Sequence, residues 1–293
     1  MLPEEVLYWL DPKPGGTYVD GTLGGGGHAR MIAERVGMEG RVIALDRDII
    51  AVQRAEKMLP SPPVMPLHAS YHRIDRVMEQ LEVESVDGIL LDLGLSSDQL
   101  ADSERGFSFQ NDGPLDLRFD VGRGEPADQL LMRLNEKEIA DVIYQYGEER
   151  FSRRIARRIV ALREERKPVR TSGELAELVR RCVPRSKNHN IDPATRTFQA
   201  LRIAVNEELQ ILSDTLRMAP DWLAPGGRMV IISFHSLEDR IVKQAFREDP
   251  RWEILTKKPI VASEQEIQSN SRSRSAKLRV ATLANRQMLG GSM

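Results

Sequence analysis

A run of glycines that begins four residues after an aspartate is the stretch of this sequence best suited to bind a ligand. In TYVDGTLGGGGHAR, Asp20 precedes four consecutive glycines at positions 24–27. Gly24, Gly26 and Ala29 satisfy the pattern G-x-G-x-x-G/A, in which glycine permits a tight turn and lets a ligand approach the backbone closely. The pattern is informative only where it follows a strand and opens a helix, and TYVDG and the residues from His28 onward predict that context.

Two carboxylates narrow the class of ligand. Asp46 ends the apolar stretch RVIALD about twenty residues further on, where an acid commonly binds a ribose hydroxyl. This favours an adenosine-type ligand, with NAD as the first candidate. Asp20 argues against NAD, because a carboxylate beside the glycine turn would repel a pyrophosphate. S-adenosylmethionine carries adenosine, an ammonium and a sulfonium but no phosphate, and suits both features. Alternatively, Asp20 caps the turn, and His28 either contacts the ligand or caps the helix.

Further polar residues follow other predicted strands. Asp92 lies in LLDLGLSSDQL, at the end of the most apolar stretch. In an open parallel sheet ligands bind outside the carboxyl ends of the strands, which places Asp92 beside the glycine loop. Tyr71 is expected either to stack on adenine or to be a half-buried core residue. His235 and Ser236 lack the G-x-S-x-G pattern of a hydrolase, so His235 is expected to contact substrate or to orient its loop.

The elements that must position these residues alternate between strand and helix at both ends of the chain. Continuous apolar strands of this kind predict an α/β fold with a parallel sheet covered on both faces. The predicted strands are 17–21, 41–46, 64–70, 86–95, 228–234, 252–258 and 277–283.

The middle of the chain has a different character. A polar loop, RGFSFQNDGPLDLRFD, precedes helices without strands, and Thr171 to Glu174 form a capping-box pattern. We therefore predict a discontinuous Rossmann-like domain, 1–102 and 197–293, interrupted by an all-helical domain, 103–196. One long helix, TFQALRIAVNEELQILSDTLRMA, is expected to lead back to the sheet.

Basic residues are concentrated in the helical segment and indicate either a phosphate-binding surface or a solvated helix face paired with glutamates. They are Arg150, Arg153, Arg154, Arg157, Arg158, Arg163, Arg166, Lys167, Arg170, Arg181, Arg185, Lys187 and Arg196.

Composition excludes several other classes of protein. The 293 residues carry 42 Lys and Arg against 44 Asp and Glu, so the positive charge is local rather than general. A single cysteine, Cys182, allows no disulfide framework and no cysteine-based zinc site, and no metal site is expected. No apolar run is long enough to span a bilayer, and the amino terminus does not resemble a secretory signal. We expect an intracellular, cytoplasmic protein that does not bind membranes.

Several long motifs resemble one known family. DGTLGGGGHAR, GILLDLGLSSDQL, YGEERFSRRIARRIV, ATRTFQALRIAVNEEL and SFHSLEDRIVK resemble the bacterial ribosomal RNA cytosine-N4 methyltransferases of the RsmH (MraW) type, in order from about Tyr18 to Leu283. The family usually begins with a His-x-Pro-Val-type segment ahead of the piece matching LPEEVLYWL, and Met1 starts inside that piece.

The resemblance implies an S-adenosylmethionine-dependent enzyme with a Rossmann-like sheet. Its substrate would be a cytosine in the decoding region of 16S rRNA, within an assembled or assembling small subunit, and the basic helical insertion would be the RNA platform. The residues implied to contact the cofactor are Gly26, Gly27, His28, Asp46, Tyr71, Asp92 and Gln99.

Asp92 has two possible roles under this reading. It either orients or deprotonates the cytosine amine, or it only binds the cofactor. Two other classes of function are also open: an NAD-dependent oxidoreductase, which would share the glycine loop and Asp46, and a non-catalytic RNA-binding protein that retains the fold.

Overall fold

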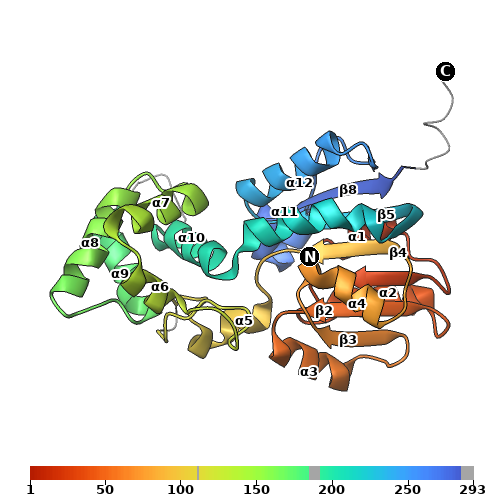
Figure 1. Ribbon diagram of the computed structural model, residues 1–293, viewed down its shortest axis with the longest axis horizontal. Coiled ribbons are helices and arrows are strands. Elements are labelled where there is room, and N and C mark those ends of the chain that lie inside the picture. Colours follow the sequence, from red (N-terminus) through yellow and green to blue (C-terminus); the bar gives the residue numbers. More distant parts are fainter. Residues whose placement is uncertain (111, 185–191, 285–293) are drawn as a thin grey trace. The chain divides into compact units, whose positions relative to one another are not determined.

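The computed structural model describes residues 1–110, 112–184 and 192–284, which form two compact units (Figure 1). The first unit combines Met1–Gly94 with Leu209–Met293, and the second is Leu95–Glu208. The sequence placed these boundaries at 102/103 and 196/197. The structure assigns LSSDQL and the helix starting at Ala194 to the second unit, because Leu95, Leu100, Phe198 and Leu201 pack in its core.

The first unit contains one mixed sheet, in the order β3-β2-β1-β4-β5-β8-β6, with β7 paired to β8. Five strands are parallel from β3 to β5, whereas β6, β7 and β8 are antiparallel to their partners, so the predicted parallel sheet has an antiparallel edge. The strands are β1 (Thr17–Asp20), β2 (Arg41–Asp46), β3 (Val64–His68), β4 (Val86–Asp92), β5 (Leu223–Ser233), β6 (Trp252–Ile254), β7 (Ile260–Val261) and β8 (Lys277–Leu283).

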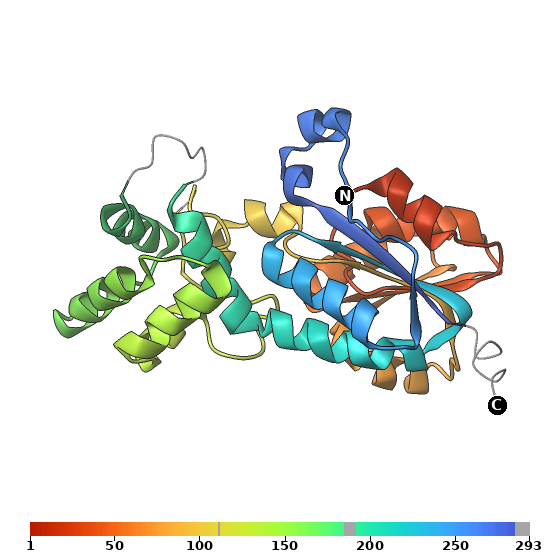
Figure 2. The ribbon, with the colours of Figure 1, turned by 90° about the horizontal axis from the view of Figure 1, so that it is seen from above.

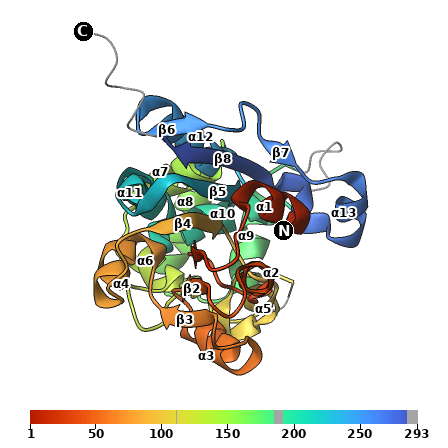
Figure 3. The same ribbon diagram turned by 90° about the vertical axis from the view of Figure 1, so that its right-hand side faces the viewer.

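Alternate side chains along these strands point to opposite faces of the sheet, and both faces are buried. Tyr18 and Leu90 belong to an apolar cluster shared with helices α1 to α3, and Val19 and Ile89 to a cluster shared with α4, α11 and α12. Figure 3 shows α1 and α2 on one side of the strands and α4 and α11 on the other. The helices of this layer are α1 (Pro3–Leu10), α2 (Gly27–Val36), α3 (Ile49–Met58), α4 (Ile74–Gln80), α11 (Glu208–Met218), α12 (Ser236–Glu248) and α13 (Glu264–Ser269), with short turns η1 (Tyr71–Arg73), η3 (Ala219–Asp221) and η4 (Ser271–Ser275).

The second unit is helical and has its own apolar core, and its green helices pack together in Figure 2. Ile143, Ile155 and Val179 are fully buried in this core. Capping boxes begin three of its described helices, at Ser96, at Asn135 and, as predicted, at Thr171. The helices are α5 (Ser97–Ala101), α6 (Ala127–Arg133), α7 (Glu136–Gly147), α8 (Ser152–Glu164), α9 (Ser172–Cys182) and α10 (Ala194–Asn206), with the turn η2 (Ser103–Arg105).

The prediction of one long helix after position 196 is wrong, because this segment forms two helices, α10 and α11. Glu207 adopts a left-handed conformation, with φ 52°, which ends α10 before α11 begins. Glu208 then accepts two hydrogen bonds from the Arg202 guanidinium, at 2.8 and 2.9 Å. Local helical periodicity continues through this point, so the pattern of apolar residues gave no sign of the break. Among the described residues, no helix is long and apolar enough to cross a membrane.

Candidate functional site

The loop between β1 and α2 is hydrogen-bonded across the carboxyl edge of the sheet. Gly21 N–H donates to the carbonyl of Leu90, and Leu23 N–H to that of Leu45, both at 2.9 Å. The Thr22 hydroxyl oxygen accepts the backbone N–H of Asp92 at 2.6 Å. These bonds tie the loop to β2 on one side and to β4 on the other, which fixes its backbone in front of the strand ends.

The glycines of this loop differ in whether the structure could accommodate a side chain in their place. Gly26 has φ +75°, and a Cβ added there would lie 3.1 Å from Leu59 Cδ1, so a side chain would meet both strain and crowding. Gly25 and Gly27 are exposed, and a Cβ on either would have no neighbour within 4 Å. The backbone at these two positions is therefore open to a ligand, and Gly27 begins α2, where free N–H groups lie.

Asp20 and Asp92 end the neighbouring strands β1 and β4. Asp20 is fully buried; its Oδ1 accepts the Thr22 N–H at 3.1 Å, and its Oδ2 is buried with no hydrogen-bond partner in the described part of the chain. Burial raises the pKa of Asp20 to about 6, and the neighbouring His28 opposes that rise. Asp92 Oδ1 is likewise buried without a partner among the described residues. Structural capping of the turn by Asp20 is real, but it uses only one of the two carboxylate oxygens.

His28 contacts Asp92 and influences Asp20 through its charge. Its Nε2 lies 3.3 Å from Asp92 Oδ2 and 3.3 Å from the amine of Met1, while its Nδ1 is buried without a described partner. The amine of Met1 is itself 3.6 Å from Asp92 Oδ2. The imidazole therefore has one nitrogen beside the Asp92 carboxylate and the other buried without a hydrogen-bond partner among the described residues.

Asp46 and Tyr71 reach the same edge of the sheet from β2 and from the turn after β3. The Asp46 carboxylate accepts Gly24 N–H at 2.7 Å and Asp48 N–H at 2.8 Å, so it also holds the glycine loop. Burial raises its pKa. A Cβ on Gly21 would lie 2.9 Å from Tyr71 Cβ, so Gly21 is required for Tyr71 to pack against the loop.

Gln99 belongs to the helical unit rather than to the sheet unit. Its side-chain Oε1 accepts Ser96 N–H at 3.1 Å while its backbone N–H donates to the Ser96 hydroxyl, which makes a capping box for α5. Sequence analysis had placed Gln99 with the cofactor-binding residues and missed this structural role. The S-x-x-Q spacing could have revealed it.

The donor set of the sheet unit fits S-adenosylmethionine better than a dinucleotide. Three polar atoms on the residues of this site are buried without a hydrogen-bond partner among the described residues: Asp20 Oδ2, Asp92 Oδ1 and His28 Nδ1. Two of them are carboxylate oxygens, which attract an ammonium or a sulfonium and repel a pyrophosphate. Across residues 1–110, 112–184 and 192–284, no group of three or more His, Cys, Asp or Glu side chains could hold a metal ion.

The described contacts of the motif SFHSLEDR stabilise the fold around α12. His235 caps α12, with its Nδ1 accepting the Glu238 N–H at 3.4 Å, and Glu238 in turn accepts the Phe234 N–H at 2.8 Å. Asp239 pairs with Arg279 at 2.7 Å and with Lys277 at 3.5 Å. Burial raises the pKa of Asp239, but hydrogen bonding and charge from these cations outweigh it and hold the pKa below its usual range. The motif thus ties α12 to β8, and His235 orients its loop.

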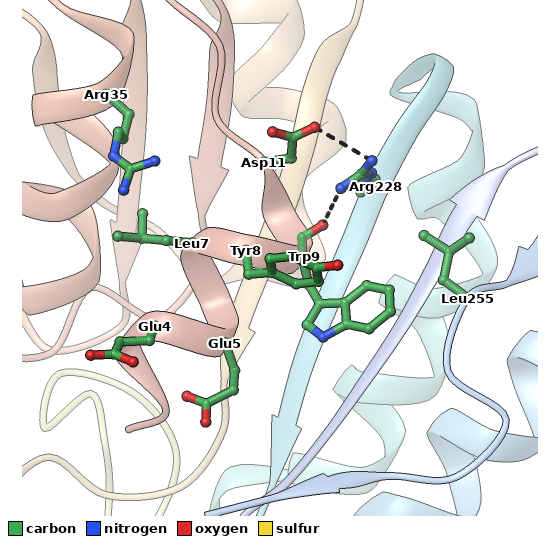
Figure 4. A pocket seen from close by; sticks show the side chains of 9 residues that line it. All are labelled: Glu4, Glu5, Leu7, Tyr8, Trp9, Asp11, Arg35, Arg228 and Leu255. Carbon is green, nitrogen blue, oxygen red and sulfur yellow. Dashed lines mark hydrogen bonds and ion pairs between the residues drawn. The ribbon is translucent and has the colours of Figure 1, made fainter.

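A separate cavity of about 840 Å³ lies beside α1 (Figure 4). Arg228 crosses it to reach the Trp9 carbonyl at 2.8 Å and Asp11 at 3.4 Å, and Glu4 and Glu5 lie along the helix. Arg228 pairs in register with Gly88, four residues before Asp92, so this cavity is not at the strand ends that carry the acids. Its charges are mixed, and they favour no class of ligand.

Known proteins resemble this chain over nearly its whole length. The model of the MraW methylase family matches residues 1–284. A Rhodopirellula baltica protein named ribosomal RNA small subunit methyltransferase H is 56% identical, over 96% of this chain and 90% of its own. A Pelobacter propionicus protein of the same name is 47% identical, over 95% of this chain and 96% of its own. A solved rRNA methylase from Streptococcus thermophilus is 10% identical over 96% of this chain and 93% of its own, with a TM-score of 0.44, too low to carry weight.

Proposed function

Because the chain belongs to the MraW methylase family, and is therefore an S-adenosylmethionine-dependent rRNA methyltransferase, we propose that it methylates the exocyclic N4 of a cytosine in the decoding region of 16S rRNA. The names of its relatives support a small-subunit substrate. The observation that carries the proposal is the pair of buried carboxylate oxygens, on Asp20 and Asp92, beside a glycine loop that admits a ligand. Family membership supports neither the NAD-dependent oxidoreductase nor the non-catalytic RNA-binding protein.

The cofactor-binding residues of the sheet unit would be Gly26, Gly27, His28, Asp46 and Tyr71. The open backbone at Gly27 accommodates a ligand, and Asp46, already holding Gly24, offers carboxylate oxygens to ribose hydroxyls. Tyr71 presents a half-buried ring for stacking. When bound, the cofactor supplies a methyl group on a sulfonium. Gln99, which caps α5, stays a proposed cofactor contact.

Asp92 is the residue we propose to act on the cytosine amine. The N4 lone pair is delocalised into the ring, so the amine must be held in line with the methyl group, roughly 3 to 3.5 Å from it. As the methyl carbon passed to N4, its bond to the sulfonium sulfur would break and leave a neutral thioether. N4 would then lose one of its protons, which a carboxylate within hydrogen-bond reach can accept. Asp92 has an unpartnered buried oxygen for this, while Thr22 fixes its backbone and His28 holds its other oxygen.

The helical unit is the proposed RNA platform. Reaching a stacked base requires the nucleotide to be flipped out, and Arg154, Arg157 and Arg158 on α8, with Arg181 on α9, would hold the surrounding phosphates. Because the proposed substrate is ribosomal RNA, we place the reaction in the cytoplasm, within an assembled or assembling small subunit.

The test is transfer of tritium from labelled S-adenosylmethionine to small ribosomal subunits from cells that lack the enzyme, followed by nucleoside analysis. We expect the label in N4-methylcytidine. Label in a different nucleoside would overturn the N4 assignment but leave the methyltransferase assignment intact. Naked 16S rRNA, assayed in parallel, distinguishes RNA from the assembled subunit as the substrate.

A further inference from the structure

A groove of about 580 Å³ lies between α8 and α9, wholly inside the helical unit and separate from the acids of the sheet unit. Its floor is apolar: Ala161 and Leu162 on α8, Leu178 and Cys182 on α9, and Val169 between the helices. Leu178, Cys182 and Val169 are each no more than 6% exposed. Burial raises the pKa of Cys182, so its thiol is a neutral part of this floor.

Positive charge surrounds the apolar floor. Five cationic side chains line the groove, whereas only Glu174 and Glu177 are acidic, and the cations are Arg154, Arg157, Arg158, Lys167 and Arg181. Glu174 is already used, since its carboxylate accepts the backbone N–H groups of Arg170 and Thr171 at the start of α9. Glu177 forms an exposed ion pair with Arg181, and Arg157 and Arg158 form exposed pairs with Glu136 and Glu165. Such exposed pairs contribute little stability and can exchange for a phosphate.

Two other basic residues of the same segment, Arg163 and Arg170, do not line the groove and contact α6 instead. Arg163 donates from Nη1 to three carbonyls at the end of α6, those of Leu131, Met132 and Leu134, at 3.0, 2.8 and 2.7 Å. Arg170 pairs with Asp128. The sequence could not make this distinction, because it counted all these residues as one basic cluster. Arg185 and Lys187 of that cluster lie outside the described residues.

We propose that this groove binds an unpaired nucleotide of the RNA substrate other than the methylated cytosine, with its base on the apolar floor and its phosphate among the arginines. The inference rests on the proposed function and adds a second binding site to it. A cationic rim alone suits any phosphate, whereas an apolar floor beside it also suits the face of a base that is free of its partner. Bases in a duplex are stacked and cannot enter a groove, whereas unpaired bases bind apolar and guanidinium surfaces.

Two matched variants test the charged rim. Arg157 and Arg153 lie one helical turn apart on α8 and are both exposed, but only Arg157 lines the groove. The full chain would be titrated against a fluorescent single-stranded RNA of the decoding region and against the same RNA annealed to its complement. Arg157→Ala should raise the single-strand Kd about fivefold and reduce the salt slope by about one. Arg153→Ala should change the Kd less than twofold.

A third variant tests the floor without removing any charge. Ala161 is half-buried in the groove, so Ala161→Trp fills it and leaves every cation in place. The single-strand Kd should rise to that of the duplex, with S-adenosylmethionine affinity by calorimetry unchanged and helical content confirmed by circular dichroism. If Ala161→Trp does not fold, Ala161→Leu gives the same test with a smaller side chain.

The outcomes separate this proposal from the proposed function. Equal effects of Arg157→Ala and Arg153→Ala, or a preserved single-strand preference in the filled variant, would overturn the groove while methylation continued. If both variants bind naked RNA normally but methylate whole subunits poorly, the groove takes a ribosomal protein instead, which also overturns the proposal. Absence of methylation by the unmodified chain would count against the proposed function alone.

Discussion

His28 Nε2 lies 3.3 Å from Asp92 Oδ2, joining the first turn of α2 to the end of β4. The two residues are 64 positions apart in the sequence, and the loop from Asp20 to Gly27 brings them together. The contact leaves the other Asp92 oxygen buried and without a described partner. It thereby orients the carboxylate that we propose to receive a proton from the substrate amine.

Replacing Asp92 by asparagine tests that role. Asn keeps the size of the side chain and its contact with His28 but is a far weaker base. We expect kcat to fall by about 10²- to 10⁴-fold at saturating cofactor, since that is the usual contribution of a positioned general base. Glu84→Gln, two residues before the opposite end of β4, is the control and should keep normal activity. An unchanged kcat in Asp92→Asn, with only the KM for cofactor raised, would assign Asp92 to cofactor binding alone.

The burial of Asp20 predicts a pH-dependent stability. The pKa of Asp20 is about 6 in the folded chain, above its value in the unfolded chain, so the folded state holds the proton more tightly. Stability from this group is complete below about pH 4 and is lost as the pH rises through 6, by about 3 kcal/mol at most. Thermal unfolding without cofactor should show this loss, and Asp20→Asn should remove it.

Cofactor binding should show the opposite pH dependence at the same residue. A cationic ligand favours the ionised form of Asp20, so the affinity for S-adenosylmethionine should increase as the pH rises through 6. Calorimetry from pH 5 to 8 measures this trend. Asp20→Asn should bind more weakly at pH 8 and show a flatter profile; an equally steep profile would mean that another group titrates.

Substitutions at two glycines of the loop should affect cofactor binding and folding stability separately. Gly27 is the first residue of α2, and a Cβ added there would have no neighbour within 4 Å. Gly27→Ala should therefore leave the Tm equal or slightly higher. It should weaken the cofactor affinity, because the added methyl group occupies the space open to the ligand. Gly26 has a positive φ and Leu59 beside it, so Gly26→Ala should cost roughly 1 kcal/mol or more of stability. Thermal melts measure the stability of both variants, and calorimetry measures their cofactor affinity. The prediction is contradicted if Gly27→Ala melts lower than Gly26→Ala.

Arg163 is expected to stabilise the helical unit rather than to bind RNA. Its guanidinium satisfies three carbonyls at the end of α6, and hydrogen bonds to a charged group contribute about 1.5 to 3 kcal/mol. Arg163→Ala should therefore lower the free energy of unfolding by about that amount, while its effect on the salt slope of RNA binding is small. Arg153→Ala on the same helix should leave the stability unchanged. The reverse pattern, in urea melts and RNA titrations, would assign Arg163 to the RNA surface.

The sequence by itself determined the strands, the glycine loop and the acids that follow β1, β2 and β4. These features are local: apolar runs specify buried strands, and parallel strands bring their carboxyl ends to one edge. It also determined that a helical segment interrupts the sheet, because the composition changes there.

Only the tertiary structure decided which polar groups were already in use. Arg163 closes α6, Glu207 ends α10 within the predicted long helix, and Asp20 keeps one oxygen without a partner among the described residues. These features do not follow from residue type and spacing, because a side chain's partners depend on how the chain folds around it. The Gln99 cap is the exception, since the S-x-x-Q spacing could have predicted it. The groove between α8 and α9 could not be predicted either, because its floor and rim come from two helices and the segment that joins them.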